Sequence, residues 1–256
     1  MLRFFIEVAY RGTAYAGFQI QENANTVQSE IEKAMGIFFR TKFELTGSSR
    51  TDAGVHAFQN FFHFDADFSE GEIHAAAYHL NAILPDDIVV KKIFRVADDA
   101  HCRFDAISRT YEYNLYHFKN PFLKDTAYFF PYPVDLKKMN EAAELIKQTH
   151  HFESFCKKNV QVRHYLCDIM ESEWLQRDGA TLVYRVRGNR FLRGMVRGLV
   201  GTILRVGRGR LSLTEFKDVI VSNNPSRVDF SVPAHGLSLM SVDYGGEVQQ
   251  KKTKRV

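Results

Sequence analysis

The residues of this chain best suited to chemistry lie in a predicted loop at residues 47–57. This loop carries an arginine and, two residues later, an aspartate. Arg50 and Asp52 lie between residues 42–45, which alternate polar and apolar side chains, and residues 59–64, which are rich in aromatic rings. Both flanks are predicted to be strands. A loop held by a sheet is a usual place for reactive groups, and a carboxylate there could act as a nucleophile or a base. Taken alone, the Thr-Asp-Ala-Gly sequence is also typical of a simple turn.

Positive charge gathers in the second half of the chain. Residues 1–108 contain 15 acidic and 10 basic side chains, whereas residues 109–256 contain 15 acidic and 24 basic ones, within a net charge of +4. One stretch without acidic residues carries a run of arginines, namely Arg185, Arg187, Arg190, Arg193, Arg197, Arg205, Arg208 and Arg210. Apolar residues recur among them at helical spacing, so part of the run is expected to line a cleft instead of forming a solvated face. Guanidinium groups suit phosphates and stack on bases, so RNA is the favoured partner, with Arg190 and Arg208 as phosphate contacts.

The remaining pattern predicts an α+β fold of two similar halves. Strands are expected over residues 2–10, 88–94, 111–117 and 239–244, and a hairpin pairs 163–175 with 180–186. Helices are expected over residues 26–39, 69–83, 136–148, 189–206 and 213–222. These elements divide the chain into a half at 1–108 that carries the Asp52 loop, a basic half at 109–245, and a basic disordered tail at 246–256.

The composition is typical of a soluble cytoplasmic protein. Cys102, Cys156 and Cys167 are scattered and form no Cys-x-x-Cys pair, which favours reduced thiols over a disulfide or zinc framework. His101 beside Cys102, and the pair His150-His151, lack the spacing and the supporting carboxylate of a metal site. No apolar run approaches the ~18 residues of a membrane span, and no signal peptide is expected.

Five blocks of the sequence, in order, resemble the TruA family of pseudouridine synthases, which isomerise uridine to pseudouridine in tRNA. The blocks are residues 9–19 with 25–28, then 50–57, 109–113, 189–197 and 233–239, and the resemblance extends from about residue 2 to about residue 244. The signature loop Arg-Thr-Asp-Ala-Gly-Val-His-Ala at 50–57 is one of them. Two positions depart from the family pattern: Phe18 stands where a tryptophan is common, and Ser48-Ser49 precede Arg50 where a small residue and a glycine are more usual.

The resemblance implies a role for each of several residues. It assigns the reaction to Asp52, either as nucleophile or as the base that starts elimination from the ribose. Arg197 matches the arginine that pairs with this aspartate, and a cation is needed because a partly dry site raises the pKa of a carboxyl group. Tyr111 matches a tyrosine that stacks on the base and is a candidate for moving the C5 proton. Leu237 corresponds to the apolar residue under the flipped ring, and Arg50 to the side chain that enters the RNA when a nucleotide is extruded.

For the whole protein, the resemblance implies two ferredoxin-like halves that share a central antiparallel sheet with a basic RNA-binding cleft. It also implies a homodimer that modifies uridines at positions 38, 39 and 40 of the tRNA anticodon stem-loop. The isomerisation breaks the C1′–N1 bond and forms a C1′–C5 bond, so it requires no redox step and no metal-activated water. We therefore predict no cofactor and no metal.

Other functions are weighed against this one. A non-catalytic RNA-binding or RNA-folding protein needs only the basic stripe, and would not need Asp52, Tyr111 and Arg197 together. A metal-dependent nuclease built on Asp52 and Asp105 lacks a convincing cluster of carboxylates. The same isomerisation at another RNA site is the remaining alternative.

Overall fold

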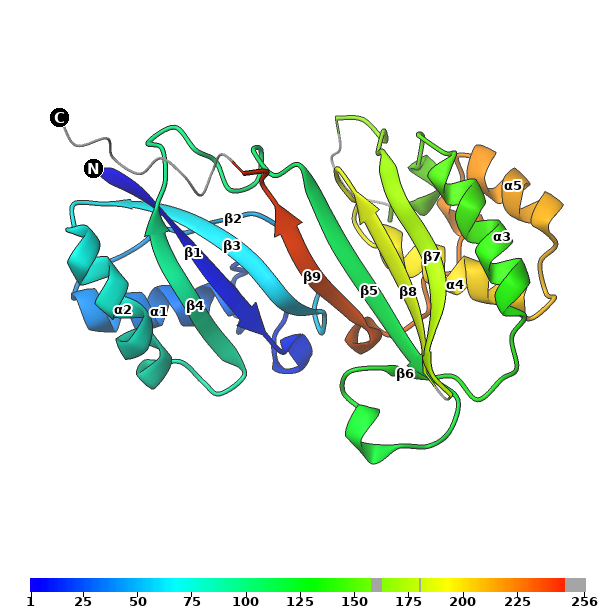
Figure 1. The fold of residues 1–256 in the computed structure, drawn as a ribbon, viewed down its shortest axis with the longest axis horizontal. Helices are drawn as coiled ribbons and strands as arrows, with labels where there is room; N and C mark the ends of the chain where they lie inside the picture. The colour runs from blue at the N-terminus through cyan, green and yellow to red at the C-terminus, as the bar shows by residue number, and fades with distance from the viewer. Residues whose placement is uncertain (158–162, 180, 247–256) are drawn as a thin grey trace. The chain divides into compact units, whose positions relative to one another are not determined.

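The computed structural model describes residues 1–157, 163–179 and 181–246. Its chain divides into two compact units (Figure 1), one containing residues 1–107 and those from Leu239 onward, the other containing residues 108–238. Each unit combines helices with mostly antiparallel strands, which confirms the α+β class. Of the tail predicted at 246–256, all but Gly246 lies outside the described residues.

The first unit is a sheet with two helices on one face (Figure 1). Its elements are β1 (Leu2–Tyr10), the 3-10 turn η1 (Gly12–Ala14), α1 (Val27–Phe39), β2 (Thr46–Gly47), β3 (His56–Ala66), α2 (Glu70–Ile83), β4 (Ile88–Arg95) and most of β9 (Leu237–Asp243). The strand order is β4-β1-β3-β9, and β2 pairs with β3. β1 runs antiparallel to both neighbours, with Leu2 opposite Ala66 and Phe4 opposite Arg95. The core includes Ile6 of β1 and Ile31 of α1, both fully buried.

The second unit is a sheet with three helices beside it (Figure 1), one of which packs on the sheet and contacts the other two. Its elements are β5 (Ser108–Tyr116), η2 (Pro121–Leu123), β6 (Tyr128–Phe129), α3 (Leu136–Lys147), η3 (Glu153–Phe155), β7 (Ile169–Asp178), β8 (Thr181–Gly188), α4 (Met195–Gly207), α5 (Leu213–Val221), η4 (Pro225–Arg227) and η5 (Ala234–Gly236). The strand order is β5-β8-β7, all antiparallel, and β6 runs parallel to β5. Trp174, Tyr184 and Tyr113 are fully buried in the core of this unit.

Three helices begin where their sequences predict, because each start is a capping box. The N-cap and N3 residues are Thr26 with Ser29, Ser69 with Glu72, and Ser212 with Glu215. In each pair the N-cap side chain accepts the N3 amide, and the N3 side chain accepts the N-cap amide. These bonds satisfy backbone donors that the first helical turn leaves without partners.

The strand predicted at residues 42–45 is wrong, since only Thr46 and Gly47 pair with β3. The backbone of Leu45 instead bonds to side chains of α1: its amide donates to Glu32 Oε1 at 2.9 Å, and its carbonyl accepts Gln28 Nε2 at 2.8 Å. The alternation still marks burial, because Phe43 and Leu45 are both buried. The same polar-apolar pattern therefore serves an irregular segment packed under a helix.

Two other predicted elements start too early. The helix predicted at 189–206 begins only at Met195, because Gly194 at its N-cap has a φ of +74° and the preceding segment is a loop. In the predicted hairpin, residues 163–168 are irregular and β7 begins at Ile169. There Phe152 N donates to Tyr165 O and Cys167 N donates to His150 O, so these residues pair with the segment that follows α3.

The division of the chain into units differs from the predicted halves at its C-terminal boundary. The sequence predicts residues 239–245 in the second half, whereas they group with the first unit. β9 neighbours β3 in the strand order, and Val242 N donates to Gln59 Oε1 at 3.1 Å. The last strand therefore returns to the unit that carries Asp52.

Candidate active site

The Asp52 loop is held by hydrogen bonds on both sides of the aspartate. Thr51 Oγ1 lies 2.8 Å from Tyr10 Oη of β1, and Thr51 O accepts the Phe18 amide at 3.2 Å. After the aspartate, Val55 N donates to Asp52 O at 3.1 Å and closes the turn. The backbone at position 52 is therefore fixed by its neighbours without using the aspartate side chain.

A buried polar network, which the sequence analysis did not predict, supports the same loop from β3. Asn60 is fully buried, and its amide group donates to Ser49 O at 2.9 Å and to Tyr10 Oη at 3.1 Å. Its carbonyl oxygen accepts Ser48 Oγ at 2.8 Å. Because each buried polar atom gains partners, the network stabilises one loop conformation instead of costing desolvation energy. A polar residue amid the apolar side chains of β3 was the one available hint.

Two glycines allow the close approaches that the loop requires. A Cβ at Gly12 would lie only 2.0 Å from Val55 O, so the turn after β1 can touch this loop only with glycine there. The Gly12 amide also donates to Nδ1 of His56, at 3.1 Å. Gly54 has a φ of +78°, a conformation that side-chain-bearing residues rarely adopt, and it completes the turn after the aspartate.

The side chains of the loop itself differ in their use. Asp52 is half-buried and Arg50 is exposed. Among the described residues, no group forms a hydrogen bond or ion pair with the Asp52 carboxylate. The loop is thus held by hydrogen bonds that do not involve the Asp52 carboxylate. A group that reacts with a substrate needs this combination of a fixed backbone and an unoccupied side chain.

Tyr111 and Leu237 belong to the second unit and are both buried. The Tyr111 ring, on β5, packs edge-on against Phe191 with centroids 5.1 Å apart. Leu237 is the first residue of β9 and follows the η5 turn, which is fixed by a bond from Tyr113 Oη to Pro233 O at 2.8 Å. Aromatic packing on one side and a fixed turn on the other hold these two side chains in defined positions.

Arg197 lies in the first turn of α4 and is half-buried. Its Nε donates to Val232 O at 2.8 Å, and its Nη2 donates to Phe230 O at 3.3 Å. These carbonyls orient the guanidinium group and leave its Nη1 donors without a hydrogen bond to the described residues. Within this part of the chain Arg197 has no carboxylate partner, so its positive charge is available to a ligand.

The arginine run divides into internal ion pairs and free cations. Arg185 and Arg177 both bind Glu112, at 2.8 and 2.7 Å, and their guanidinium groups hold the pKa of this buried carboxyl below its ordinary value although burial alone raises it. Arg187 pairs with Glu171 at 2.8 Å. Arg185 and Arg187 therefore have their charge paired with a carboxylate at the surface of the sheet.

Arg190 and Arg208, the predicted phosphate contacts, are half-buried and carry no ion pair among the described residues. Arg190 precedes α4 and lies against His164, with Nη1 2.9 Å from its Nε2. Arg208 follows the last turn of α4, with its guanidinium carbon 4.0 Å from the centroid of the Tyr132 ring. Neither cation is neutralised by a carboxylate, and this fits an anionic ligand.

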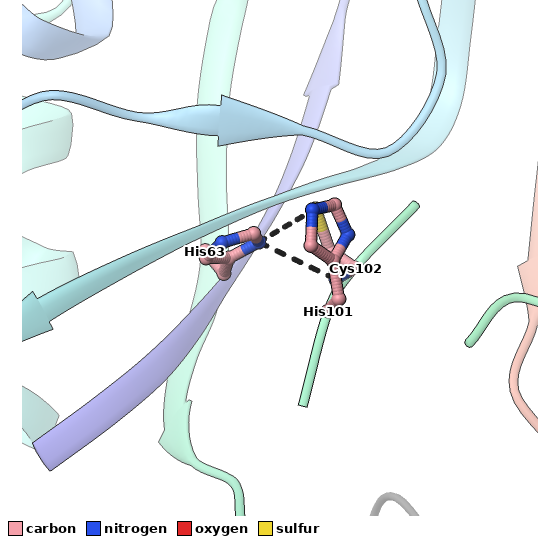
Figure 2. Close-up of side chains that lie close together, drawn as sticks. All are labelled: His63, His101 and Cys102. Carbon is pink, nitrogen blue, oxygen red and sulfur yellow. Dashed lines mark hydrogen bonds between the residues drawn. The ribbon is translucent and has the colours of Figure 1, made fainter. Parts of the chain in front are cut away.

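Figure 2 shows His63, His101 and Cys102, a cluster in the first unit with ligand-type atoms within 4.8 Å of one another. His63 Nδ1 lies 3.2 Å from Cys102 Sγ and accepts the Cys102 amide at 3.3 Å. His101 Nδ1 accepts the Arg103 amide at 3.1 Å. Because each Nδ1 accepts a backbone amide, the proton of each neutral ring lies on Nε2. A metal could therefore bind only by displacing these bonds, and we interpret the cluster as a hydrogen-bonded part of the fold.

The cluster makes the stability of the protein depend on pH. Burial, with His101 nearby, lowers the pKa of His63 from 6.5 to about 4. The unfolded chain therefore takes up a proton at this side chain between pH 6.5 and 4 while the folded protein does not. Allowing for solvent screening, we expect the free energy of unfolding to fall by roughly 2 kcal/mol across this range, and to fall no further through His63 at still lower pH.

This expectation is checked by urea unfolding of the parent and of His63→Gln at several pH values. The parent should lose its stability advantage over the variant as the pH falls from 7 to 4. An advantage that stays constant over the range would show that His63 does not titrate in this way.

A shallow open hollow of about 610 Å³ lies along α1, and most of its lining lies between Ser29 and Phe43. Its lining includes Lys33, Arg40 and Lys42, and none of the predicted site residues. Glu32 also lines it, but this carboxylate is bonded to Gln28 and to the Leu45 amide. The hollow is thus no part of the candidate site.

Among the described residues, none of the helices combines the length and the apolar composition that a membrane-spanning helix needs.

Known proteins match this chain over nearly its whole length. A family model described as tRNA pseudouridine synthase matches residues 6–105 and 142–245. The chain is 43% identical over 246 residues to tRNA pseudouridine synthase A of Bacteroides fragilis, covering 96% of this chain and 98% of that one. It is 42% identical to the enzyme of the same name from Porphyromonas gingivalis, over 97% and 99% of the two chains, and 36% identical to that of Staphylococcus aureus strain MRSA252, over 99% of each.

Proposed function

Because this chain belongs to the tRNA pseudouridine synthase family, we propose that it converts uridine to pseudouridine at positions 38, 39 and 40 of the tRNA anticodon stem-loop. It is an isomerase, since the reaction rearranges one nucleotide without adding or removing atoms. One observation supports Asp52 as the reacting group. Its loop is held by a buried hydrogen-bond network, and no described residue forms a hydrogen bond or ion pair with its carboxylate.

The reaction begins at Asp52. The carboxylate acts either as a nucleophile at C1′ or as the base that removes a ribose proton, and in both cases it must be ionised. A site that admits uracil excludes water and raises the pKa of a carboxyl group, so a nearby cation is required. Arg197 supplies this positive charge, and two carbonyl contacts fix its orientation.

The remaining site residues handle the base and the RNA. Uracil must detach, turn and present C5 to C1′ while it stays bound. Tyr111 stacks on the uracil and is the candidate for moving the C5 proton, and Leu237 provides the apolar surface beneath the ring. Arg50, exposed on the loop, enters the RNA in place of the extruded nucleotide.

Several wider features belong to the same proposal. The two units form ferredoxin-like halves that share a central antiparallel sheet with a basic RNA-binding cleft, and the active protein is a homodimer. It works in the cytoplasm, in keeping with Cys102, Cys156 and Cys167, which form no disulfide among the described residues. The isomerisation needs neither a metal nor a cofactor.

The experiment that tests this function is incubation with an unmodified tRNA transcript, followed by carbodiimide labelling and primer extension. Stops at positions 38, 39 and 40 support the proposal. Stops at other positions would support the isomerisation but contradict the proposed target positions. Binding of tRNA without any stop would support a non-catalytic RNA-binding protein instead. An Asp52→Asn sample serves as the blank.

The salt dependence of tRNA binding separates phosphate contacts from other arginines. Log Kd should change linearly with log salt concentration, with a slope of about 0.7 to 0.9 per neutralised phosphate. Arg190→Gln should reduce this slope by roughly one unit if Arg190 meets a phosphate. Arg185→Gln is the control, because Arg185 is bound to Glu112. An unchanged slope for Arg190→Gln would assign this arginine to the contact with His164 alone.

A further inference from the structure

Tyr132 and Arg208 form a stacked pair beside the end of α4, in the second unit. The guanidinium carbon of Arg208 lies 4.0 Å from the centroid of the Tyr132 ring and 5.9 Å from that of Phe130. A cation this close to an aromatic face is attracted by the ring, and a guanidinium group can also stack on it. The contact fixes the direction of an otherwise flexible side chain.

The tyrosine is itself held in place. Its ring contacts Phe130, with centroids 5.3 Å apart, and Phe130 is buried. The Phe130 amide donates to Tyr116 O at 2.8 Å, which ties this segment to β5. At the other end of the segment, Asp135 N donates to Gly207 O at 2.8 Å, one residue before Arg208. The ring thus lies on a segment that is anchored at both ends.

The donors of Arg208 are unused. Within the described chain its guanidinium group has no hydrogen bond and no ion pair, although it is half-buried. The carboxylate closest to Tyr132 in sequence, Asp135, caps α3 and lies 3.7 Å from Lys138. Stacking occupies only the flat face of a guanidinium group, so its N–H edge stays free to bind two oxygens of one anion.

The surroundings favour a polyanion over a small acid. Arg205 and Arg210 belong to the same end of α4, and neither forms an ion pair among the described residues. Tyr132 is 47% exposed, so the stacked pair is open to solvent. Several cations without ion pairs near one helix end, one of them with an oriented guanidinium group, suit the phosphodiesters of a nucleic acid backbone.

We propose that Tyr132 and Arg208 form one phosphate-binding element for the tRNA backbone, in which the tyrosine ring orients the guanidinium group toward a phosphodiester. This inference rests on the proposed function, because that function supplies the RNA. Arg208 makes the contact. Tyr132 is a positioning residue whose effect on binding acts through Arg208.

A double-mutant cycle on tRNA affinity tests the element. Arg208→Gln should weaken binding of unmodified tRNA by about tenfold at low salt and reduce the salt slope by roughly one unit, because it removes a charge-assisted contact to phosphate. Tyr132→Ala should weaken binding by about two- to fivefold, the worth of an exposed cation–π contact. The double variant should bind no more weakly than Arg208→Gln alone.

Two control variants make the result specific. Tyr132→Phe keeps the ring and should bind as the parent does. Phe122→Ala removes another aromatic side chain of the second unit, one that is 91% exposed, and should leave both affinity and slope unchanged. Circular dichroism and thermal melting of each variant check that it is folded, and a misfolded Tyr132→Ala is replaced in the cycle by Tyr132→Leu.

The outcomes separate this inference from the proposed function. Additive effects in the double variant, or an unchanged salt slope for Arg208→Gln, would overturn the element even if the parent forms pseudouridine. A parent that binds tRNA without forming pseudouridine would overturn the function, while a non-additive cycle would still support the element.

Discussion

Asp52→Asn is expected to abolish pseudouridine formation while tRNA affinity stays within a few-fold of the parent. An amide has nearly the shape of a carboxylate but cannot act as a nucleophile or a base, and loss of a catalytic group usually costs at least ~10²-fold in rate. The loop should keep its conformation, because Tyr10, Thr51 and Asn60 hold it through bonds that do not involve the aspartate side chain. The measurement is single-turnover formation of pseudouridine beside a binding titration.

A matched control removes the same charge elsewhere in the first unit. Asp67 is exposed and lies 3.1 Å from the N-terminal amine, so Asp67→Asn changes the net charge equally without touching the loop. This variant should turn over at the parental rate. Turnover by Asp52→Asn above about a hundredth of the parental rate would assign the reaction to a different group.

Tyr111→Phe is expected to bind tRNA normally yet fail to release tritium from uridine labelled at C5. Phenylalanine keeps the ring and its stacking on the base, worth about 1–3 kcal/mol in single-stranded binding, but it lacks the hydroxyl group that would move the C5 proton. The edge-on contact with Phe191 involves the ring and should survive. Tritium release and tRNA affinity are measured on the same samples.

Tyr111→Leu provides the comparison, because it removes the ring as well. It should lose both affinity and turnover, so that the difference between the two variants isolates the hydroxyl group. If Tyr111→Phe releases tritium at nearly the parental rate, the tyrosine is a stacking surface only. The proton acceptor would then be Asp52 itself or a bound water.

The local signals in the sequence were reliable where short-range bonds decide the structure. The capping pairs at Thr26, Ser69 and Ser212 set helix starts, because partners three residues apart meet in any helix. β1 was predicted to its ends by an apolar run bounded by a turn. The loop at 47–57 was also marked by sequence, and it does present a half-buried Asp52. The family was also identified from short stretches of sequence, namely the five blocks that include the signature loop.

Side-chain partners distant in sequence could not be predicted in this way. The segment around Leu45 is not a strand, because the backbone amide and carbonyl of Leu45 bond to the side chains of Glu32 and Gln28 on the preceding helix. The arginine run looked uniform in sequence, yet Arg185 is bound to a buried glutamate, whereas Arg208 stacks on a tyrosine. Only the positions of Glu112 and Tyr132 in the folded chain distinguish these two arginines.

The sequence by itself therefore determined the kind of most elements and the family, and it singled out Asp52 as the candidate reacting group. Tertiary structure alone decided what holds that carboxylate in place, through Asn60 and Tyr10, and which cations remain free for a ligand. The reason is physical: helix caps and turns depend on neighbours within a few residues, whereas burial, ion pairing and the availability of a charge depend on which distant side chains the fold brings into contact.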